Sequence, residues 1–117
     1  MSIQKYTTAL AFCLATLFIS TISKAQVVMV TKSVKEANVK VFVTSYESEA
    51  DVLVFKTPFI NNANGNAGSW YFTKNQGEAN KRIYFVPGKE IADIVICYTT
   101  DSKLAGWKNK RKKHFMD

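Results

Sequence analysis

The sequence predicts a β-rich α+β fold, in which one compact domain of about six short strands is joined by turns and single helical turns. Three observations predict it. Of the 117 residues, 47% are apolar and 21% are charged, which is typical of a single globular domain. Alanine recurs from position 37 at an almost constant interval of 13 residues. A triplet rich in strand-forming residues precedes each of these alanines.

Residues 1–25 are typical of an export signal. Residues 9–22, ALAFCLATLFISTI, are mainly apolar but too short for a membrane span, which needs about 20 residues. Ser23 and Ala25 supply the small side chains of a signal-peptidase site. We therefore expect a signal helix outside the fold, cleavage after Ala25, and a periplasmic or secreted protein with no transmembrane span. The alternatives are an uncleaved N-terminal anchor and lipidation at Cys13.

The remaining sequence, residues 26–107, is predicted to be one domain built from a repeated unit. The repeated alanines are Ala37, Ala50, Ala63, Ala79, Ala92 and Ala105, with intervals of 13, 13, 16, 13 and 13 residues. The triplets that predict strands are residues 28–30, 41–43, 54–56, 70–72, 83–85 and 96–98. Several are apolar on both faces, as buried central strands are. Each unit therefore consists of a strand, a polar turn and a single turn of α-helix or 3-10 helix that carries the alanine.

Two further positions of the unit are regular. Thr stands six residues before five of the six alanines, where it begins the polar turn. Asn or Asp directly follows five of the six alanines, and we expect it to cap the helical turn or to adopt a left-handed conformation. The alanines are predicted to be buried where only a small side chain fits. The acidic residues Glu49 and Asp51 fall at repeated positions, so we interpret them as structural residues and not as a catalytic pair.

The unit with the 16-residue interval contains the segment 57–69, TPFINNANGNAGS. This segment is predicted to be an exposed loop. It is either a functional loop or a tolerated insertion. After signal cleavage Cys97 is the one cysteine, so no intramolecular disulfide forms. Its position in the apolar run 94–98 favours a buried small side chain over a reactive thiol.

The strings KVFVTSYESEADVLVFKT, RIYFVPGKEIADIVICYTT and KLAGWKNK resemble the septoil-knot family of small bacterial domains of unknown function. The resemblance extends from Val27 to about Lys110. It implies a knotted backbone with seven crossings, but no catalytic or binding residues. This sequence departs from the family pattern in the Asn-rich insertion and in the Asn residues that replace Asp in several units.

Residues 108–117 are predicted to form a basic tail that leaves the fold after Trp107, which anchors the end of the domain. The basic side chains are Lys108, Lys110, Arg111, Lys112 and Lys113. They make up most of the net positive charge outside the signal, because residues 26–107 hold nine basic and eight acidic side chains. The pattern predicts contact with an anionic surface or polymer. Nucleic acid is an unlikely partner for an exported chain. The alternative is a solvated tail that aids solubility.

No motif identifies a catalytic residue, a cofactor or a metal site. One His and one remaining Cys leave no ligand set for zinc, and no motif supports a pair of Cys97 with His114. The leading hypothesis is an exported, non-catalytic structural or binding module. The alternative is a small periplasmic or secreted enzyme with an unrecognised site around the Asn-rich loop or Cys97.

The export signal gives the first testable prediction. Mass spectrometry of the mature protein should show an N-terminus at Gln26 or its cyclised form. An exported protein that retains Met1 would contradict the prediction of cleavage.

Overall fold

The computed structural model describes residues 26–63 and 65–117. The predicted signal helix and its cleavage site lie outside these residues, apart from Gln26. The strands are β1 (Val27–Val30), β2 (Val39–Val43), β3 (Val52–Lys56), β4 (Ser69–Phe72), β5 (Lys81–Phe85), β6 (Ile94–Thr99) and β7 (Gly106–Trp107). Each predicted triplet lies within one of the first six strands, so the prediction of six repeated strands is confirmed.

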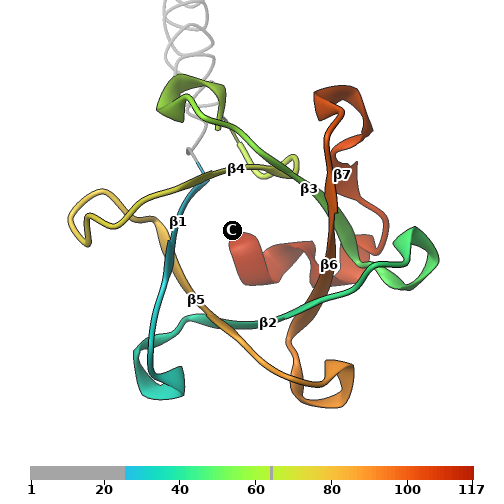
Figure 1. Ribbon diagram of the computed structural model, residues 1–117, viewed down its shortest axis with the longest axis horizontal. Coiled ribbons are helices and arrows are strands. Elements are labelled where there is room, and N and C mark those ends of the chain that lie inside the picture. The colour runs from blue at the N-terminus through green and yellow to red at the C-terminus, as the bar shows by residue number, and fades with distance from the viewer. Residues whose placement is uncertain (1–25, 64) are drawn as a thin grey trace, which may run out of the picture.

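Strands β1 to β6 form a closed parallel barrel. The strand order around the barrel is β4-β1-β5-β2-β6-β3, and a pairing of β3 with β4 closes it. Strand β7 pairs antiparallel with β3. Figure 1 shows these strands as a ring whose corners carry projecting loops, with the C-terminal segment inside the ring. In the described residues all helices are 3-10 helices, so the fold is a β barrel with 3-10 turns and the α component of the predicted class is absent.

The chain passes around this barrel twice. The first pass contributes β1, β2 and β3, and the second contributes β4, β5 and β6, so strands of the two passes alternate. The register keeps a constant offset: Val27 pairs with Tyr71, Val39 with Ile83 and Val52 with Ile96, each 44 residues apart. Each strand of one pass is therefore held between two strands of the other. Its pairing partners are distant in sequence except where β3 pairs with β4, which follows it in the chain.

The barrel interior is filled by side chains in layers. One residue from each strand forms a central layer, and all six are fully buried: Val28, Val41, Val54, Trp70, Ile83 and Ile96. Because side chains alternate across a strand, residues two positions earlier face the same interior. Val39, Val52 and Ile94 stand at such positions and are also buried. These residues form a continuous core, and Leu53 and Cys97 pack with Ala50 in a separate cluster.

Except for the loop between β4 and β5, the loops between strands contain short 3-10 helices. They are η1 (Val34–Glu36), η2 (Glu47–Glu49), η3 (Ile60–Asn62), η4 (Lys89–Ile91) and η5 (Ser102–Leu104). A repeated alanine directly follows each of them. The predicted burial of these alanines holds only for Ala50 and Ala63, whereas the other four are half-buried. The loops project from the barrel, so most of these alanines contact protein on one side only.

The Asn or Asp after the alanine joins the two passes of the chain. Its backbone N–H donates to a carbonyl of the other pass, and its side-chain oxygen accepts the N–H of the same residue. The four described pairs are Asn38 with Arg82, Asp51 with Val95, Asn80 with Val27, and Asp93 with Lys40. No described residue other than glycine has a positive φ, so the predicted left-handed conformation is wrong. Only a short side chain with a carbonyl or carboxylate oxygen can close this reciprocal pair.

The C-terminal segment does not leave the fold, and the prediction of a tail outside the domain is wrong. Residues Lys110–Met116 form the 3-10 helix η6, and Met116 is fully buried within the core cluster. The Gln26 side-chain amide donates to the Met116 carbonyl over 2.9 Å. Trp107 is only half-buried, in β7, although it packs against the core. Met116 therefore closes the amino end of the barrel, so the chain is anchored to the core beyond Trp107 as well.

The buried position of Met116 gives a prediction for stability. Met116→Ala should lower the free energy of unfolding by about 2–5 kcal/mol, because it leaves a cavity in a closed core. The measurement is denaturant unfolding followed by tryptophan fluorescence. Leu104→Ala is the matched control, since Leu104 is 55% exposed and its truncation should change stability little. Equal stability of the two variants would show that Met116 does not fill the barrel.

Candidate functional site

Asp51 holds the C-terminal segment against the barrel. Its backbone carbonyl accepts the N–H groups of Lys108 and Asn109 over 2.8 and 2.9 Å. Its carboxylate accepts the Val95 N–H over 2.8 Å and the side-chain amide of Asn109 over 3.2 Å. The side chain of Asn109 in turn caps η6 by accepting the N–H of Arg111. Helix η6 therefore begins at a fixed point on the barrel.

The five predicted basic residues divide into two groups on this segment. Lys108 donates from Nζ to the carbonyl of Glu47, and Lys112 Nζ lies 3.5 Å from the Asp51 carboxylate. Lys110, Arg111 and Lys113 are exposed and have no ion-pair partner among residues 26–63 and 65–117. Three of the five cations are therefore free to meet a partner.

The geometry of η6 gathers these free cations. A 3-10 helix has three residues per turn, so Lys110 and Lys113 lie above one another. Arg111 and His114 form the neighbouring row, and His114 Nδ1 lies 2.8 Å from the Arg111 carbonyl. We call Lys110, Arg111, Lys113 and His114 the basic face. It is an ordered surface at the amino end of the barrel and not a solvated tail.

The Asn-rich segment also contacts this region, through a residue that the sequence did not single out. Asn66 donates to the Lys113 carbonyl and to the Asp117 carboxylate, both over 2.9 Å, and it accepts the Trp107 indole N–H over 2.8 Å. Residues 58–62 are exposed as predicted, but Gly68 is buried. A Cβ on Gly68 would lie 2.6 Å from the backbone N of Gly106, so glycine is required where the segment passes β7. The segment is therefore exposed at residues 58–62, as predicted, but buried where it passes β7.

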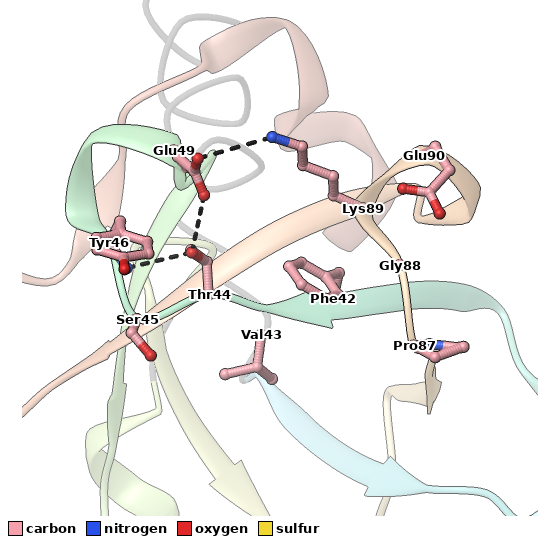
Figure 2. A pocket seen from close by; sticks show the side chains of 10 residues that line it. All are labelled: Phe42, Val43, Thr44, Ser45, Tyr46, Glu49, Pro87, Gly88, Lys89 and Glu90. Atoms are coloured by element: carbon pink, nitrogen blue, oxygen red, sulfur yellow. Dashed lines mark hydrogen bonds and ion pairs between the residues drawn. The ribbon is translucent and has the colours of Figure 1, made fainter.

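A cleft lies at the other end of the barrel, between the loops that follow β2 and β5 (Figure 2). Its volume is about 480 Å³. Glu49 accepts the Thr44 hydroxyl over 3.2 Å and pairs with Lys89 over 3.7 Å, while Tyr46 stands at the edge with 68% of its surface exposed. Both partners of the ion pair are exposed, so it contributes little to stability.

The two carboxylates considered in the sequence belong to different networks. Glu49 faces the cleft of Figure 2, whereas Asp51 is buried against Val95 and the C-terminal segment. Cys97 and His114 are likewise apart: Cys97 is buried with Ala50 and Leu53, whereas His114 is exposed on η6. Neither pair is assembled in the described part of the chain, and the same residues hold no cluster of three metal-ligating side chains.

The interleaved barrel agrees with a comparison against protein families. The model of the 7(1) septoil knot domain matches residues 25–108. The chain belongs to the septoil knot domain family. The resemblance found in the sequence is therefore confirmed, and the basic face of this septoil knot domain lies beyond the matched residues. Comparisons with curated proteins and with solved structures give no match. Among the described residues, no helix has the length and apolarity to cross a membrane.

The contacts of Asp51 give a prediction for the basic face. Asp51→Ala should free the C-terminal segment, because it removes the acceptor of Asn109 and the ion-pair partner of Lys112. Hydrogen exchange of residues 109–116 should become at least tenfold faster than in the parent domain, which corresponds to about 1.4 kcal/mol.

Asp93→Ala is the matched control for this experiment. Asp93 occupies the same position of the repeat and accepts the Lys40 N–H over 2.8 Å, but it makes no hydrogen bond or ion pair to the C-terminal segment. Both variants should lose stability, and only Asp51→Ala should selectively loosen residues 109–116. Equal exchange of this segment in the two variants would contradict the tethering role of Asp51.

Proposed function

We propose that this septoil knot domain is an exported, non-catalytic binding module that holds an anionic surface or polymer against its basic face. The observation that carries the proposal is the fixed set of exposed cations on η6 that have no carboxylate partner in the described part of the chain. Cations of this kind attract polyanions and anionic lipid surfaces.

The rigid placement of these cations favours binding. Lys110 and Lys113 occupy the same face of η6, so their charges repel and an anion between them removes that repulsion. The helix is held by Asp51, by Asn66 and by the burial of Met116. A partner therefore meets cations that are already ordered, and it loses less conformational entropy than it would on a flexible tail.

Export is part of this proposal and rests on the sequence of residues 1–25. Its consequence is that the anionic partner is a lipid surface or an extracytoplasmic polymer, while nucleic acid is disfavoured. The family match begins at residue 25, which is consistent with a domain that does not need the preceding segment.

We also propose that the backbone of this domain is knotted. Family membership supports it, and so does a strand order in which the two passes of the chain alternate around the barrel. A knotted chain must unthread to unfold fully, so the expected effect is slow unfolding without a disulfide. An experimental structure with an unknotted backbone would contradict this part of the proposal.

The test of the binding function is a charge-removal experiment. The triple variant Lys110→Gln, Arg111→Gln, Lys113→Gln should bind vesicles of phosphatidylcholine and phosphatidylglycerol about 100-fold more weakly than the parent domain. The reason is that each cation near an anionic surface contributes about 1 kcal/mol. Binding is measured by co-sedimentation at several salt concentrations.

The matched control removes three cations elsewhere on the surface. Lys32→Gln, Lys35→Gln, Lys103→Gln lowers the net charge by the same amount, and all three lysines are exposed. This control should retain most of the affinity. Equal losses in the two triple variants would show that net charge and not the basic face is responsible. Binding that is insensitive to salt would contradict an electrostatic partner.

A further inference from the structure

The carboxyl end of the barrel is open, unlike its amino end. The residues two positions beyond the central layer continue along the inner face of each strand. They are Val30, Val43, Lys56, Phe72, Phe85 and Tyr98, which we call the mouth ring. Val30, Val43 and Phe85 are 43%, 39% and 37% exposed, whereas the central layer below them is completely buried. The mouth ring is therefore a shallow apolar surface above a filled interior.

One member of the mouth ring is charged. Lys56 occupies the position that is apolar in the other five strands. Its Nζ lies 4.3 Å from the centre of the Tyr98 ring and 5.4 Å from that of Phe72, so cation–π contacts hold the ammonium group at the mouth. Within residues 26–63 and 65–117 no carboxylate lies within ion-pair distance of Lys56. This cation retains donors for an incoming anion.

Two further clefts lie at this end of the barrel, and Lys56 lines the first of them. The first, of about 390 Å³, is lined by Phe55, Lys56, Tyr98, Thr99 and Thr100. The second, of about 350 Å³, is lined by Met29, Val30, Phe72, Thr73 and Lys74. Both combine apolar walls with lysine and threonine side chains. No acidic residue lines the first cleft, whereas in the second the Thr73 hydroxyl donates to the Glu78 carboxylate over 2.6 Å. These volumes fall in the range of small-molecule sites.

The cleft of Figure 2 occupies the equivalent place between β2 and β5, and its charge is different. It contains Glu49 and Glu90 together with Lys89, and Glu49 already pairs with that lysine. An anion would meet repulsion there, whereas Lys56 is the one charged side chain that lines the first cleft. The repeat therefore supplies similar surfaces, and substitutions at single positions make the cleft at Lys56 selective for anions.

We propose that the mouth ring and the cleft at Lys56 bind a small aromatic carboxylate. Its ring would lie on the Tyr98 and Phe72 side chains, and its carboxylate would accept hydrogen bonds from Lys56 and from the Thr100 hydroxyl. The Thr99 hydroxyl already donates to the Asp101 carbonyl. The filled central layer leaves no channel for a long alkyl chain, so the ligand is short. This site is independent of the basic face, which lies at the opposite end of the barrel.

Burial of Tyr98 is consistent with this geometry. It raises the pKa of the Tyr98 phenol above its ordinary value of 10.0, so the hydroxyl remains protonated at neutral pH. An ionised phenol would repel a carboxylate, whereas the neutral ring offers an apolar surface with one polar end.

The test is a titration of the ¹⁵N-labelled domain with 2-naphthoate, followed by NMR. Saturable shifts should map to residues 55–56, 72–74 and 98–100, and the neutral 2-naphthamide should bind at least tenfold more weakly. Shifts confined to the basic face would overturn the proposal, because they would show binding of the anion by η6 alone. Tighter binding of dodecanoate than of naphthoate would overturn the assignment of an aromatic ligand.

Two variants separate the specific site from general charge. Lys56→Gln should weaken 2-naphthoate binding at least tenfold, whereas Lys103→Gln removes an exposed lysine on η5 and should leave it unchanged. Lys56→Val should fold like the parent, because valine stands at the equivalent positions of β1 and β2. Equal affinity of Lys56→Val and the parent domain for naphthoate would overturn the role of Lys56.

Discussion

The reciprocal hydrogen bonds between the two passes of the chain are the constraint on which the barrel depends. At each of the four described sites an Asn or Asp donates its backbone N–H to a carbonyl of the other pass. Its side-chain oxygen accepts the N–H of that same residue. Asn38 with Arg82 and Asp93 with Lys40 are two examples. The strands cannot slide without breaking both bonds at once, and a slip of one residue would turn the core side chains outward. These reciprocal hydrogen bonds therefore fix the register of the whole barrel.

The reciprocal pair of Asp51 and Val95 also links the barrel to the candidate binding surface. The Asp51 carboxylate accepts hydrogen bonds both from Val95 of the other pass and from Asn109. The basic face is therefore fixed directly to the barrel. Asn66 supports it from the longer unit, and Met116 fixes its far end inside the barrel. A departure from the repeat, the Asn-rich insertion, thus serves to hold a segment that follows the repeat.

The two ends of the barrel have different chemistry because different segments meet there. At the amino end the C-terminal segment fills the interior with Met116 and exposes cations. At the carboxyl end no described segment fills the mouth ring, and Lys56 is its one charged member. The repeat makes the strands equivalent, so differences in function arise from single substitutions and from the chain beyond the repeat.

The sequence by itself determined the six strands, their polar turns and the family, because a small side chain, an Asx residue and a strand triplet recur at a fixed interval. It did not determine that the Asx residues join the two passes, since their partners are 44 or 53 residues away. It also gave a wrong account of residues 108–117. Their charge pattern is that of a solvated tail, and Phe115 and Met116 are too few to predict burial. Only the closed barrel, whose amino end requires an apolar side chain, decided that this segment folds back into the core.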